Sequence, residues 1–96
     1  MKINFNVSLK DMKGLEQDQN LGELLAVMLA QSSEGNVNKL IPWGFKLMAG
    51  QELDLDMADQ KLLIDFIGGI KDLTNLGKYR LTEVIEEAQA LHSKKG

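Results

Sequence analysis

The chain has 96 residues, of which 44% are apolar and 26% charged, a composition that suits one globular domain spanning residues 1–96 and excludes intrinsic disorder. It has no cysteine, so disulfides and thiolate metal sites are excluded and a reducing, cytoplasmic setting is expected. The net charge is −3, no stretch approaches the about 20 apolar residues of a membrane span, and the first residues lack the apolar run of a signal peptide.

Alternating residues at the N-terminus predict a half-buried strand. Ile3, Phe5, Val7 and Leu9 are apolar, and polar residues separate them. A turn over residues 11–14 follows, and residues 15–18 are expected to return as a short second strand. The alternation reappears at residues 52–55, which we expect to pair with the N-terminal strand.

Four segments show helical periodicity. The first follows the N-cap Asn20 and covers residues 21–31. The second ends near Met48 and contains Pro42, which requires either a late helix start or a bend. The third, residues 57–70, has Asp56 as its cap, and the fourth, residues 75–92, has Thr74. The sequence therefore predicts a mainly helical α+β fold of about four helices with a small two- or three-stranded sheet at one edge, in the order β(β)-α-α-β-α-α.

The second helix carries more apolar side chains than one neighbour can cover. Trp43 and Phe45 widen its apolar arc to about 200°. Exposed aromatics on such a face are common interface anchors, although both could also be core residues. We therefore predict a protein interface at Trp43, Phe45 and Leu47, with Leu76 and Tyr79 on the last helix as a second patch, and expect a homo-oligomer or another protein partner.

Reactive groups do not converge in this sequence. The acidic run Glu52, Asp54, Asp56 and Asp59 loosely matches a calcium loop but lacks its glycine and bidentate glutamate, so strand-edge and capping roles are favoured. His92 is the only histidine, too few for a typical zinc site or for activating a serine nucleophile. We expect no enzyme activity, no catalytic residues, no bound metal and no cofactor.

Helices 57–70 and 75–92, joined through Gly68-Gly69, suggest an alternative function as a DNA-binding transcriptional regulator. Asn75, Lys78 and Arg80 would then touch DNA, but acidic residues follow on the same exposed side. Nucleic-acid binding normally needs a basic face, and none is visible in the sequence. Nucleic acid is therefore the disfavoured partner.

Two stretches of the chain combine apolar positions, a helix cap and a turn glycine: Lys39-Leu40-x-x-Trp43-x-x-x-Leu47-x-x-Gly50-x-x-Leu53-x-Leu55 followed by Asp59, and Leu73-Thr74-Asn75-Leu76-x-Lys78-x-x-Leu81. In these residues the chain resembles small bacteriophage and prophage proteins of uncharacterised function. The resemblance implies a phage assembly, accessory or regulatory protein, and it carries no catalytic residues. Pro42 within the tryptophan helix departs from that pattern.

Overall fold

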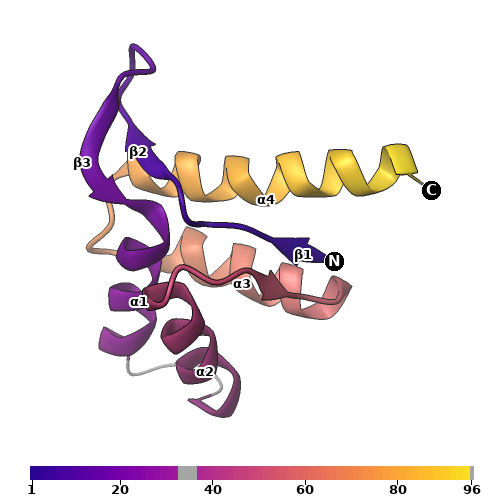
Figure 1. The fold of residues 1–96 in the computed structure, drawn as a ribbon. Helices are drawn as coiled ribbons and strands as arrows, with labels where there is room; N and C mark the ends of the chain where they lie inside the picture. The colour runs from indigo at the N-terminus through magenta and orange to yellow at the C-terminus, as the bar shows by residue number, and fades with distance from the viewer. Residues whose placement is uncertain (33–36, 96) are drawn as a thin grey trace.

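The computed structural model describes residues 1–32 and 37–95, without the side chains of residues 93–95. Its elements follow in the order β1, β2, β3, α1, α2, β4, α3, α4 (Figure 1), which confirms the predicted mainly helical α+β fold. The α1–α2 pair lies on one side of the molecule and α4 runs across the other, with α3, β1 and β4 between them.

The strands form two separate antiparallel pairs. β1 (Lys2–Ile3) pairs with β4 (Leu53–Asp54), as predicted, and β2 (Ser8–Lys10) pairs with β3 (Glu16–Asn20). The alternating stretch at the N-terminus is thus split between two sheets. The Val7 amide donates to the Phe5 carbonyl at 2.8 Å, a tight local bond that separates β1 from β2.

The β2–β3 hairpin projects from the body of the protein (Figure 1). Asp11 Oδ1 accepts hydrogen bonds from the amides of Lys13 at 2.8 Å and Leu15 at 2.9 Å, and Gly14 has a φ of 83°, which only glycine adopts freely. The turn predicted over residues 11–14 is therefore built from its own side chains and places Met12 and Leu15 in solvent.

Capping side chains fix where three of the helices begin. Asn20 Oδ1 accepts from the Glu23 amide at the start of α1 (Leu21–Gln31), and Thr74 Oγ1 accepts from the Gly77 amide at the start of α4 (Asn75–Lys95). Asp56 and Asp59 form a reciprocal capping box on α3 (Met57–Gly69). α2 (Val37–Met48) begins five residues before Pro42, close to the late start expected near residues 38–41, and Pro42 lies inside the helix.

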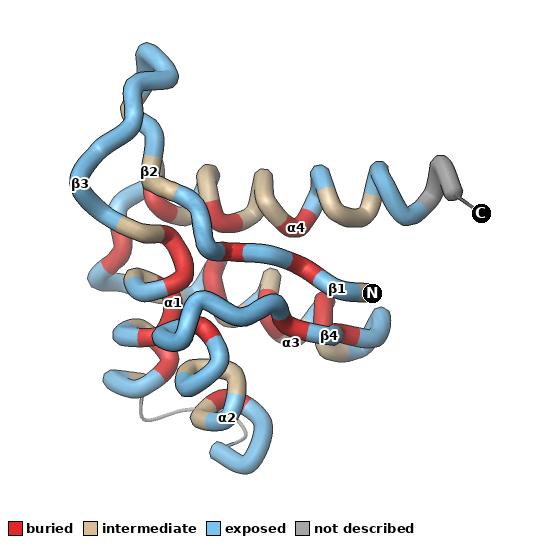
Figure 2. The backbone as a smooth tube through the Cα atoms, viewed as in Figure 1, coloured by how far each residue is buried: buried red, intermediate tan, exposed pale blue. Residues whose placement is uncertain are grey.

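One apolar core lies where β1, β4 and the helices meet, shown by the buried segments in Figure 2. Its fully buried large side chains come from every helix, from β1 and β4 and from the residues that follow these two strands. They are Ile3, Phe5, Leu25, Leu29, Leu47, Leu53, Leu55, Leu63, Ile67, Leu81 and Ile85. Gln60 is buried among them with its amide satisfied, since Nε2 donates to the Leu55 carbonyl at 3.0 Å and Oε1 accepts from Gln89 at 2.9 Å.

Candidate functional site

Helix α2 has a stripe of exposed apolar side chains beside its buried face. Leu40 and Leu47 point into the core, whereas Val37, Phe45 and Met48 are 68%, 72% and 55% exposed. Val37, Ile41, Phe45 and Met48 follow at steps of four, four and three, so they share one side of the helix. Exposed apolar side chains that lie next to one another, unlike single ones, can mark an interaction site.

Helix α1 extends this stripe. The two helices lie close together, since a Cβ placed on Gly22 would be 3.4 Å from the Leu47 carbonyl oxygen and one on Gly44 would be 3.8 Å from that of Ala26. With Leu25 and Leu29 in the core, the turn of about 100° per residue directs Val27 and Ala30 away from it. Both are exposed.

We call the resulting surface the outer face of the α1–α2 pair. It consists of Val27, Ala30, Val37, Ile41, Phe45 and Met48. None of these six side chains is charged, and the exposed Glu23 lies on the same side of α1 as Val27 and Ala30, at steps of four and three along the helix. A surface that is apolar and poor in charges is the usual composition of the centre of a protein interface.

The structure divides the predicted site at α2. Phe45 belongs to the outer face, and Trp43 is half-buried against the core. Leu47 is only 2% exposed, so its assignment to the interface is corrected. Residues two positions apart on a helix point about 200° away from each other, and Phe45 and Leu47 therefore serve opposite sides.

Val37, Ile41 and Met48 were not part of the predicted interface, although they share one side of α2 with Phe45. Their helical spacing was visible in the sequence, but Leu40 and Leu47 fall on an adjoining arc of the same wheel. Only the position of α1 shows where the buried arc ends and the exposed arc begins. Val27 on α1 could not be added without knowing that the two helices pack side by side.

The second predicted patch, Leu76 and Tyr79, lies on α4 and is separate from the outer face (Figure 1). Leu76 is half-buried, and Tyr79 is 61% exposed with the Arg80 guanidinium 5.6 Å from its ring centroid. That spacing allows a cation–π contact within the helix. These two residues therefore do not join Phe45 in a single binding surface.

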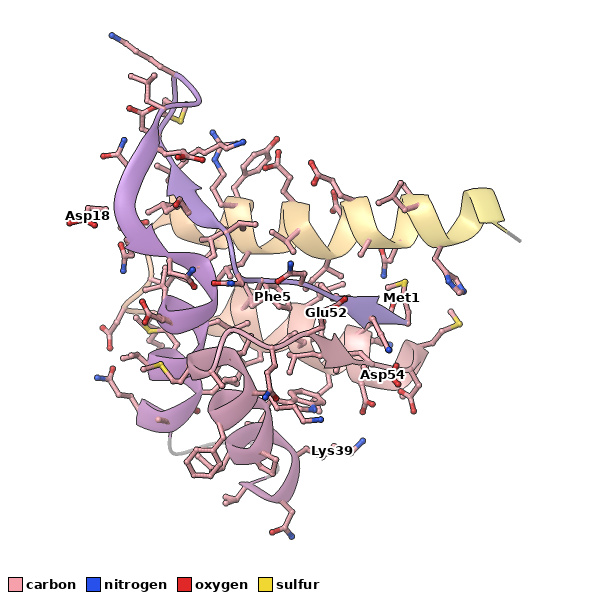
Figure 3. The ribbon with its side chains drawn as sticks, viewed as in Figure 1. Met1, Phe5, Asp18, Lys39, Glu52 and Asp54 are labelled. Carbon is pink, nitrogen blue, oxygen red and sulfur yellow. The ribbon has the colours of Figure 1, made fainter. Side chains whose placement is uncertain are left out.

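Each aspartate of the acidic run contacts a partner within the protein. Asp54 accepts from the Met1 amino group at 3.2 Å, and the two residues lie together in Figure 3. Asp56 and Asp59 cap α3, and Asp59 Oδ1 also accepts from Lys39 Nζ at 2.6 Å, which lowers the pKa of the Asp59 carboxyl. Within residues 1–32 and 37–95, no three acidic or histidine side chains gather in the way a metal ion requires.

The cations at the start of α4 are also engaged internally. Lys78 Nζ donates to the Gly68 carbonyl at 3.3 Å, and Arg80 donates to the carbonyls of Lys10 and Asp11. Glu83 accepts from Arg80 at 3.2 Å on the same helix. These side chains hold α4 to its neighbours, which reduces their availability to nucleic acid phosphates.

A hollow of about 640 Å³ lies between the N-terminal segment and α4. Its rim mixes basic and acidic side chains from separate elements: Lys2, Lys10, Arg80 and His92 with Glu16, Glu52, Glu83 and Glu87.

No helix in the part of the chain that the structure describes is both long and apolar enough to cross a bilayer. No protein-family model matches the chain, and no curated protein or solved structure matches it either.

Proposed function

We propose that this protein is a non-enzymatic protein-binding module that acts in the cytoplasm through the outer face of the α1–α2 pair. The observation that carries the proposal is the 72% exposure of Phe45 on a mainly apolar surface built by two helices. A rigid aromatic side chain on such a surface contributes more binding free energy than its neighbours once a partner excludes water from it.

The role that best fits such a module is assembly or accessory work of the phage or prophage kind. That part of the proposal is supported by the resemblance of residues 39–55 and 73–81 to proteins of that class. The DNA-binding alternative has less support, because the cations that would read DNA, Lys78 and Arg80, donate hydrogen bonds to main-chain carbonyls of the protein itself.

Photo-crosslinking tests the proposal. A photoreactive benzoyl-phenylalanine placed at Phe45 should give covalent adducts on irradiation, both in purified protein and in extract of the producing cells. The same group placed at Met57, which is 85% exposed on α3, is the matched control and should give few adducts. Excess wild-type protein should compete with adduct formation, and excess Phe45→Ser protein should not.

Mass spectrometry of the adducts identifies the partner. A single protein species crosslinked from position 45 and absent from position 57 supports the proposal. Equal adducts from both positions, or none from position 45, contradict it, because a partner bound to the outer face contacts position 45 and not position 57.

A further inference from the structure

We draw no further inference here: the strongest candidate, the outer face of the α1–α2 pair, belongs to the site already described, and nothing in the structure shows what covers it.

Discussion

Arg80 Nη2 donates a 2.6 Å hydrogen bond to the main-chain carbonyl of Asp11, a residue 69 positions earlier. Arg80 Nε donates to the neighbouring Lys10 carbonyl at 3.0 Å. One guanidinium, positioned by α4, thereby holds the β2–β3 hairpin at the end of β2, where the turn begins. Hydrogen bonds from charged donors are among the stronger ones in a folded protein.

Arg80→Met keeps the apolar stem and removes the donors. We expect the free energy of unfolding to fall by about 1–2 kcal/mol, and the amides of residues 10–16 to exchange with solvent faster than those of the core. Hydrogen exchange followed by NMR measures both effects. Lys13→Met, the same charge change at the hairpin tip, should leave this exchange as it is; unchanged exchange in Arg80→Met would show that the hairpin is held by other contacts.

Phe45 and Leu47, two residues apart, should respond oppositely to truncation. Leu47 is 2% exposed, so Leu47→Ala should cost about 2–5 kcal/mol of unfolding free energy through the cavity it leaves. Phe45→Ser should change the stability of the monomer by no more than about 0.5 kcal/mol, since that side chain is largely in solvent, and should abolish partner binding. Urea unfolding at low protein concentration separates the two, and a large loss in Phe45→Ser would place Phe45 in the core.

Gly22 and Gly68 should also differ when each is replaced by alanine. A Cβ at Gly22 would lie 3.0 Å from Asn20 Oδ1 and 3.3 Å from the Phe5 carbonyl oxygen, so Gly22→Ala must displace the α1 cap or the backbone of residue 5 and is destabilising. A Cβ at Gly68 meets no atom within 4 Å. Gly68→Ala should therefore stabilise α3 by up to about 1 kcal/mol through helix propensity.

Thermal unfolding of the two glycine variants gives the comparison. The midpoint should fall for Gly22→Ala and rise for Gly68→Ala. Equal shifts in one direction would mean that the close approach of α1 to residues 5 and 47 does not control stability at this point.

The Lys39–Asp59 pair predicts a dependence of stability on pH. The hydrogen bond from Lys39 holds the pKa of Asp59 below its ordinary value of 3.8, and the same bond raises the pKa of Lys39 above 10.5. A lowered carboxyl pKa stabilises the fold above the ordinary value, and this contribution is lost as pH falls through the lowered pKa. The raised Lys39 pKa contributes below 10.5 and its contribution is lost as pH rises through the raised value.

Urea unfolding of the wild type and Lys39→Gln measures this contribution, since the variant removes the ammonium but keeps the Asp56–Asp59 cap. The stability gap between the two proteins should be present near pH 7 and should shrink as the pH falls through the lowered pKa of Asp59. A gap of constant size across this range would contradict the assignment of the pair.

Local chemistry explains why so much of the fold was predictable. Asn20, Asp56 and Thr74 each mark a helix start because a side-chain oxygen there satisfies an amide that the helix itself cannot. The alternation at residues 52–55 likewise predicted the partner of the N-terminal strand. These signals need only neighbouring residues to be read.

The candidate surface was harder to predict because it depends on two helices at once. Whether Phe45 or Leu47 is exposed depends on which side of α2 packs against α1 near Gly22. The sequence of α2 alone does not determine that side. The interruption of the N-terminal strand was also missed, because the bond from Val7 to Phe5 leaves the alternation of side chains unchanged.

The pairing of β1 with β4 joins segments about 50 residues apart in the sequence, whereas the α1–α2 contact is local. Closing a long loop costs more chain entropy than closing a short one. During synthesis, β1 must therefore wait for Leu53 to emerge from the ribosome before its edge is covered. Until then Ile3 and Phe5 stay in water, and nascent chains are most open to aggregation or chaperone capture at that stage.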